Sequence, residues 1–141
     1  MTDSLENERE RILERKKAEL LEKHLGETQK SGPNEAPTEP IEVQNGGHLE
    51  ELLSVHPVVL VDCYADWCGP CQMMEPTIDA LAAETDAAIA KLDVDANQGL
   101  AAQLGARGVP TFVLFADGEP VDRLVGAQDR ATLEGLIERG Q

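Results

Sequence analysis

Residues 41–141 are predicted to form an α/β domain, with a central mixed sheet of four or five strands flanked by helices on both faces. Two continuous apolar runs, VVLVDCYA and AIAKLDV, are typical of strands buried in the middle of a sheet. Helical patterns alternate with these strands, which favours parallel pairing through helical crossovers. A third apolar run, TFVLF, is followed by Asp117-Gly118, which is typical of two-residue hairpin turns, so an antiparallel strand is also expected.

The elements of this domain follow one another at short intervals. In chain order, we expect a helix over 48–55, a strand over 58–65, a helix over 70–84, a strand over 88–94, a helix over 97–104, a strand over 111–115, a returning strand over 120–126 and a helix that ends near 138. Pro76 lies inside the second helix and predicts a kink, because proline has no N–H to donate. Asp129 is suited to cap the last helix.

The first 40 residues have a different composition from the rest of the chain. Residues 1–26 are predicted to form a charged N-terminal helix, since Asp3 and Glu6 resemble a capping box and Gly26 is suited to end it. Its apolar positions form only a thin stripe, so both a solvated helix and a helix that binds a partner or itself remain open. Residues 27–40 are polar and rich in proline, which predicts a flexible linker before the domain at 41–141.

The charge of the chain excludes several classes of partner. The net charge is -15, from 27 acidic and 12 basic residues, so the phosphates of nucleic acids and anionic membranes would be repelled. We find no run of apolar residues long enough to span a bilayer and no secretory signal at the N-terminus. A cytoplasmic location is therefore expected, where a pair of nearby cysteines is more often catalytic or metal-binding than a permanent crosslink.

Cys68 and Cys71 form a C-x-x-C pair at the predicted junction of a strand and a helix. Pro70 suits the first helical turn, which places Cys68 at the helix N-terminus, where free N–H groups stabilise a thiolate. A structural zinc site would need four ligands, and none of the three histidines has ligand spacing to the pair, so no metal is expected. A crosslink across so short a step would hardly constrain the unfolded chain. A redox-active dithiol is the favoured interpretation, with Cys68 as its reactive member.

Asp62 is an acidic residue inside the apolar run that leads to the cysteine pair. Burial of an unpaired carboxylate is costly and raises its pKa, which is what a general base near neutral pH requires. The alternative is a structural aspartate paired with Lys91, which is the only lysine after residue 40.

The segment Trp67 to Cys71, WCGPC, resembles the active-site signature of the thioredoxin family. The resemblance extends to VDCYADWCGPCQMMEP, which is similar to the strand, active site and kinked helix of that family, and to AKLDVDAN, similar to its next strand. GARGVPTFVLFADGEPVDRLVGA resembles the family's cis-proline loop, hairpin and groove glycine. The resemblance covers about residues 41–139 and implies the thioredoxin fold.

The resemblance also implies roles for individual residues. Cys68 would attack a disulfide in a target protein, and Cys71 would resolve the mixed disulfide, which leaves a Cys68–Cys71 disulfide. Asp62 would be the proton acceptor with Lys91 beside it, and Pro110 would follow a cis peptide bond. A shallow apolar groove for the substrate is implied around Trp67, Gly69, Pro70, Val109, Gly126 and Ala127.

The implied function is reduction of protein disulfides by dithiol–disulfide exchange, without a bound cofactor. The implied partners are disulfide-containing target proteins and a thioredoxin reductase or an equivalent dithiol donor, and a monomer is expected. Gly69-Pro70 resembles the reducing members of the family. The alternative is a binding module or accessory subunit with the same fold, tethered to a partner by the N-terminal helix.

Two features depart from the common pattern of the family. Cys63 replaces a usual aromatic residue, and strand alternation places it opposite Asp62 and Tyr64, which favours a buried, inert thiol over a regulatory one. The domain is also unusually acidic, with 17 acidic and five basic residues over 41–141. This composition predicts adaptation to molar salt, as in halophiles, with an ordinary acidic thioredoxin as the alternative.

Overall fold

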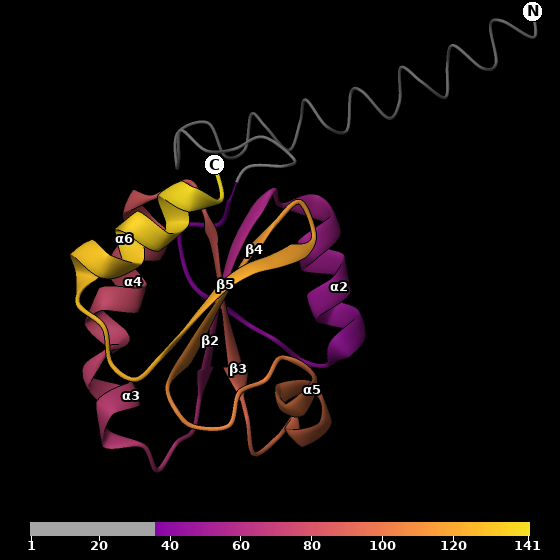
Figure 1. The fold of residues 1–141 in the computed structure, drawn as a ribbon, viewed down its shortest axis with the longest axis vertical. Helices are drawn as coiled ribbons and strands as arrows, with labels where there is room; N and C mark the ends of the chain where they lie inside the picture. Colours follow the sequence, from indigo (N-terminus) through magenta and orange to yellow (C-terminus); the bar gives the residue numbers. More distant parts are fainter. Residues whose placement is uncertain (1–35) are drawn as a thin grey trace, which may run out of the picture. The chain divides into compact units, whose positions relative to one another are not determined.

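The computed structural model describes residues 36–141, which contain a five-stranded mixed sheet (Figure 1). The strands are β1 (Ile41–Glu42), β2 (Val58–Tyr64), β3 (Ala88–Asp93), β4 (Thr111–Ala116) and β5 (Glu119–Val125), in the spatial order β1-β3-β2-β4-β5. β1, β3 and β2 are parallel, whereas β4 runs antiparallel to both β2 and β5. The predicted mixed sheet is confirmed, with five strands. The predicted helix over 1–26, and residues 27–35 of the predicted linker, lie outside the described residues.

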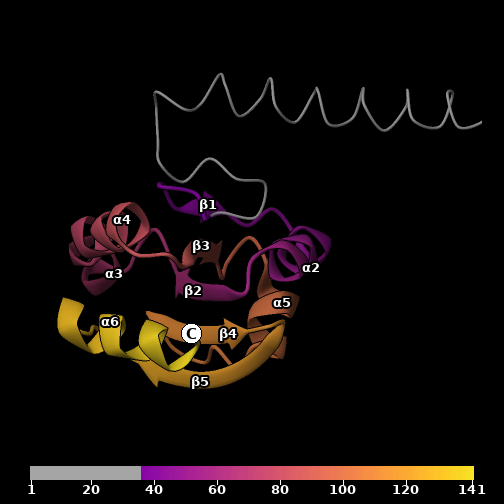
Figure 2. The same ribbon diagram turned by 90° about the horizontal axis from the view of Figure 1, so that it is seen from above.

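Helices cover both faces of the sheet, as predicted. They are α2 (Gly46–Val55), α3 (Gly69–Met73), α4 (Glu75–Glu84), α5 (Gln98–Gln103) and α6 (Arg130–Arg139). Figure 2 shows α3, α4 and α6 on one side of the sheet and α2 and α5 on the other. β2 is therefore a central strand that is covered on both faces, which explains its continuous apolar sequence.

Local chemistry accounts for where the helices begin and break. α2 starts at Gly46, earlier than predicted, because the side chain of Asn45 accepts a 2.8 Å hydrogen bond from the N–H of His48 and caps the helix. The predicted helix over 70–84 is two helices that are separated at Met74, since Pro76 cannot donate a hydrogen bond back across the junction. The predicted kink is therefore a junction between two helices just before the proline, at which Met74 itself keeps helical backbone angles.

The hairpin and the last helix follow the sequence prediction closely. Asp117 and Gly118 have φ values of 53° and 85°, as the two-residue turn between β4 and β5 requires. The side chain of Asp129 accepts a 2.9 Å hydrogen bond from the N–H of Thr132, which caps α6. These contacts fix the path of the chain from the sheet into the C-terminal helix.

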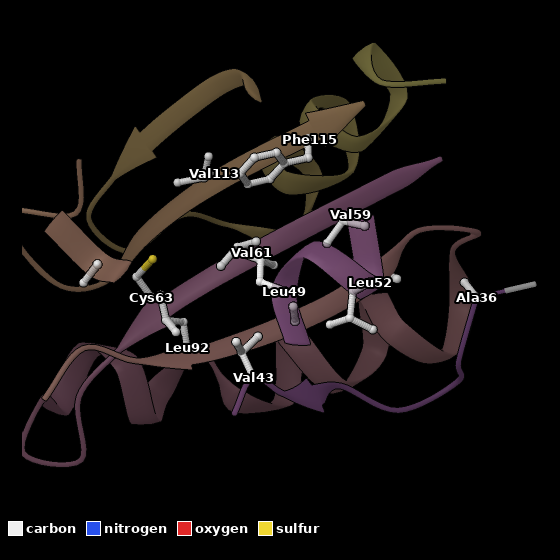
Figure 3. Packing of buried hydrophobic residues seen from close by; sticks show 13 residues of the cluster. Ala36, Val43, Leu49, Leu52, Val59, Val61, Cys63, Leu92, Val113 and Phe115 are labelled. Atoms are coloured by element: carbon white, nitrogen blue, oxygen red, sulfur yellow. The ribbon is translucent and has the colours of Figure 1, made fainter. Parts of the chain in front are cut away.

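The alternation of β2 divides the core into two layers. Val59, Val61 and Cys63 face α2 and join a cluster that extends to Phe115 on β4 (Figure 3). Leu60 belongs to the other layer, between the sheet and the helices α4 and α6. Each fully buried leucine, isoleucine or valine stabilises the fold by about 1.5–3 kcal/mol relative to an exposed one. Asp62 lies on this second face, so a carboxyl group is held inside a rigid, largely apolar layer.

The described part of the predicted linker, residues 36–40, contains no helix or strand. Ala36 is nevertheless buried and belongs to the same core cluster as Leu49 and Leu52 of α2. The packed body of the domain thus includes residues a few positions before β1.

Candidate active site

Cys68 and Cys71 lie where the chain passes from β2 into α3. They form a disulfide, and their Cα atoms are 5.2 Å apart. Cys68 is the N-cap residue of α3, and its Sγ accepts a 3.1 Å hydrogen bond from the N–H of Cys71. The free N–H groups of a first helical turn favour negative charge, so this position suits a thiolate. Both cysteines are buried.

Asp62 occupies the middle of β2 with only 2% of its surface exposed. Within residues 36–141, its Oδ1 has no hydrogen-bond partner. Burial raises the pKa of the carboxyl group from 3.8 to about 7; Lys91 opposes this rise, and Glu42 and Glu75 support it. The prediction of an awkwardly buried acid in this strand is confirmed.

Asp62 and Cys71 line the same small cavity. Its volume is about 50 Å³, and Asp62, Cys71, Glu75 and Lys91 contribute to its wall. The rest of the lining comes from the adjoining residues Tyr64, Ala65, Asp66 and Gln72. A polar cavity needs only about 10–15 Å³ to accommodate a water molecule, so this one is large enough to hold water in contact with its lining residues.

Lys91 is beside Asp62 in the sheet, as predicted, but its ammonium group contacts other side chains. The two residues are paired in the register of β2 and β3. The Nζ atom lies 3.7 Å from Oε2 of Glu75 and 4.6 Å from the centre of the Tyr64 ring. The hydroxyl of Tyr64 in turn donates a 2.6 Å hydrogen bond to Glu42. Sequence reasoning missed both glutamates, because each reaches the site from a separate element.

The loop before β4 approaches the disulfide from the other side. The Val109–Pro110 peptide bond is cis, and Val109 packs against the cluster formed by Ala65, Cys68 and Cys71. The N–H of Gly126 donates a 2.8 Å hydrogen bond to the carbonyl of Pro110. Gly126 has a φ of 93°, a backbone conformation that favours glycine. Val109 thus lies beside the cysteines, and Gly126 is hydrogen-bonded to the adjoining Pro110.

Trp67 is 70% exposed, which rules out a core-filling role for its ring. Its Nε1 donates a 2.8 Å hydrogen bond to Oδ2 of Asp95, which holds the ring at the surface. Gly69, Pro70 and Ala127 are also exposed, and so is Met73, which sequence reasoning did not select. Asp95 was missed as well, because it follows a different strand and only the fold brings it to the tryptophan.

Cys63 faces away from this site. It is fully buried among Val61, Leu92 and their neighbours in the layer beneath α2 (Figure 3). Burial raises the pKa of its thiol from 9.0 to about 12, with a smaller contribution from Asp62. This environment supports the inert interpretation of the third cysteine.

Metal-binding clusters and membrane-spanning helices are both absent from residues 36–141. Within this range, no group of three or more histidine, cysteine, aspartate or glutamate side chains is arranged to hold a metal ion. No helix in this range is long and apolar enough to cross a membrane.

Comparison with known proteins gives a consistent answer. The family model named thioredoxin matches residues 39–139. A thioredoxin of Mycobacterium tuberculosis is 44% identical over 95 residues, which are 66% of this chain and 82% of that protein. A bifunctional thioredoxin reductase/thioredoxin of Mycobacterium leprae is 42% identical over 95 residues, 66% of this chain and 21% of that longer protein.

A solved structure matches over the same region. A mutant thioredoxin from Halobacterium salinarum is 58% identical, with a TM-score of 0.72, over 74% of this chain and 92% of that one. The family model covers the sheet, the cysteine pair and the loop with the cis peptide bond. The chain belongs to the thioredoxin family and is a disulfide oxidoreductase.

Proposed function

We propose that this protein reduces disulfides in other proteins, with Cys68 as the nucleophile, Cys71 as the resolving thiol and Asp62 as the proton acceptor. The observation that carries this proposal is the cavity that Cys71 shares with a buried carboxyl group whose pKa lies near 7. Family membership supports the chemistry of the cysteine pair, and the cavity supports the assignment of the base.

The proposed reaction has two exchange steps. The Cys68 thiolate attacks one sulfur of a target disulfide, so a mixed disulfide forms and one target thiolate leaves. Cys71 then loses its proton to Asp62, and its thiolate attacks Sγ of Cys68, which releases the second target thiolate. Two electrons have passed to the target, and Cys68 and Cys71 are joined as a disulfide. Asp62 is needed only for the second step, because Cys71 is buried and loses its proton reluctantly.

The raised pKa of Asp62 suits this second step at neutral pH. A carboxyl group with a pKa of about 7 is substantially ionised at neutral pH and is a far stronger base than an exposed aspartate. Below that pKa the group is protonated and cannot accept a proton. We therefore expect the second step to slow as the pH falls through about 7.

The proposed substrate surface surrounds the cysteine pair. Trp67 and Met73, next to the pair in the sequence, are exposed, and Val109 of the cis-proline loop packs against both cysteines. Within residues 36–141, the backbone N–H and carbonyl of Val109 make no hydrogen bond. An extended segment of a target protein could pair with these groups while its disulfide faces Cys68. Gly69, Pro70, Gly126 and Ala127 complete the proposed groove.

The oxidised protein must be recharged by a dithiol donor, and we propose a thioredoxin reductase for this role. The Mycobacterium leprae relative, a bifunctional thioredoxin reductase/thioredoxin, supports a partner of this kind. We propose the cytoplasm as the location, because a reducing compartment maintains such donors. The protein would act as a monomer, because one chain contains all the residues that we propose for the exchange.

We further propose that the protein works at high salt. Residues 41–141 contain 17 acidic and five basic residues, and strong self-repulsion is expected in dilute buffer. The 58% identity to a thioredoxin from Halobacterium salinarum supports this proposal. High concentrations of K⁺ or Na⁺ would screen the repulsion and stabilise the folded state.

Turbidimetric reduction of insulin tests the proposed function directly. The full chain should accelerate precipitation of the insulin B chain in the presence of a dithiol, both in dilute buffer and at high salt. Cys68→Ser should abolish this acceleration, because the attacking thiolate is lost. Cys63→Ser is the matched control and should keep most of the activity. Absence of turnover by the wild-type chain, together with tight binding of a partner by Cys68→Ser, would instead indicate a binding module.

A further inference from the structure

Lys91 lies between two carboxyl groups and forms an ion pair with only one of them. In the sheet it is the direct neighbour of Asp62. Its ammonium nevertheless contacts Glu75, at 3.7 Å, and the face of the Tyr64 ring. Among the described residues, no ion pair joins Lys91 to Asp62, and Oδ1 of Asp62 has no hydrogen-bond partner. The cation nearest to the buried acid is therefore engaged by another group.

Glu75 is placed for this contact by the break between α3 and α4. It is the first residue of α4, immediately after the break at Met74 and before Pro76. Its side chain is 56% exposed, whereas that of Lys91 is only 20% exposed, so the ion pair forms at the mouth of the cavity. Asp62 and Cys71 line the same cavity. Glu75 thus draws the lysine head group toward the solvent side.

The other charged groups that act on Asp62 are acidic, so they cannot form an ion pair with its carboxylate. Glu42 faces it from β1 and Glu75 from α4, and both disfavour a second negative charge. Phe112 is its uncharged neighbour on β4. Cys71 faces it from α3 across the cavity, and the hydroxyl of Tyr64 is bound to Glu42. Among residues 36–141, Lys91 is the only cation that lowers the pKa of Asp62, so its position determines whether the acid is paired.

We propose that Glu75 is a positioning residue for the exchange reaction: it holds the ammonium of Lys91 away from Asp62 and so keeps that carboxyl group free to take the proton of Cys71. The inference rests on the proposed role of Asp62. Without Glu75, the lysine can turn toward Asp62 and stabilise its charge. The buried acid would then become a weaker base, although it would remain in the same place.

The direct test is a titration of Asp62 by ¹³C NMR of its side-chain carboxyl in the oxidised full-length protein. Glu75→Gln should lower the titration midpoint by about one pH unit, which is a tenfold change in the acid dissociation constant. Asp79→Asn is the matched control, because it removes one negative charge from the next turn of α4 without touching Lys91. It should leave the midpoint nearly unchanged. Equal shifts in the two variants would overturn the proposal, since they would reflect net charge alone.

A second pair of variants separates positioning from direct repulsion. In a Lys91→Gln background there is no ammonium to hold, so Glu75→Gln should then shift the midpoint by much less than it does in the wild-type chain. Shifts of the same size in both backgrounds would overturn the positioning role. The titration does not depend on turnover. If Asp62 is not the proton acceptor, the pH profile of insulin reduction will not follow the midpoint, while the NMR shifts still decide the role of Glu75.

Discussion

Replacement of Asp62 by asparagine should make the oxidised protein more stable, by an amount that depends on pH. The pKa of Asp62 is raised from 3.8 to about 7 in the folded state, and each unit corresponds to about 1.4 kcal/mol, so ionisation costs the fold about 4 kcal/mol. This cost is absent below the unfolded pKa of 3.8, where both states are protonated. It grows as the pH rises and is complete above about 7, where the folded protein is ionised as well.

The measurement is the free energy of unfolding by urea at several pH values on both sides of neutrality, with Cys68 and Cys71 kept as a disulfide so that they do not titrate. The difference between Asp62→Asn and the wild-type chain should be small in acid and should increase by about 4 kcal/mol above neutral pH, an upper value because the site relaxes around the charge. Asp66→Asn, an exposed carboxyl on the wall of the same cavity, is the matched control. A difference between Asp62→Asn and the wild-type chain that stays constant with pH would refute the assignment of a strongly raised pKa.

Three further predictions concern other parts of the chain. Cys63 should react with a bulky maleimide far more slowly than reduced Cys68 in the folded protein, because Cys63 is fully buried and its pKa is raised to about 12. Mass spectrometry of the labelled protein measures both rates, and rapid labelling of Cys63 would contradict the prediction. The midpoint of thermal unfolding should rise between dilute buffer and ~2 M KCl, where charge repulsion is screened, and equal midpoints would remove the proposed adaptation to salt. Asp129→Ala should lower the midpoint of urea unfolding, because α6 loses its cap, whereas Asp129→Asn should lower it much less.

Local patterns in the sequence were sufficient for most of the fold. The apolar run at β2, the Asp117-Gly118 turn and the capping residue Asp129 each act over a few neighbours, so each could be interpreted without the rest of the chain. The break at Met74 was predicted only as a kink, since a sequence pattern shows that Pro76 lacks a donor but not how far the neighbouring turns will adjust.

The electrostatics of the site were less predictable than its chemistry. Cys68, Cys71 and Asp62 stand close together in the sequence, and their residue types are unusual for where they occur. Glu75 and Asp95 carry no such signal, because each matters through a side chain from a distant part of the sequence: Lys91 of β3 for the first, and Trp67, in the turn after β2, for the second. An exposed glutamate at a helix start is ordinary until the fold shows what it contacts.

The break between α3 and α4 separates the helix that carries the two cysteines from the helix that carries Glu75. The first turn of α3 donates a backbone N–H to Sγ of Cys68, whereas α4 has a separate first turn that begins at Glu75. The chain can therefore vary the residue at position 75 without moving the cysteines. A substitution at this one surface position would change the pH dependence of the exchange while Cys68 and Cys71 stay in place.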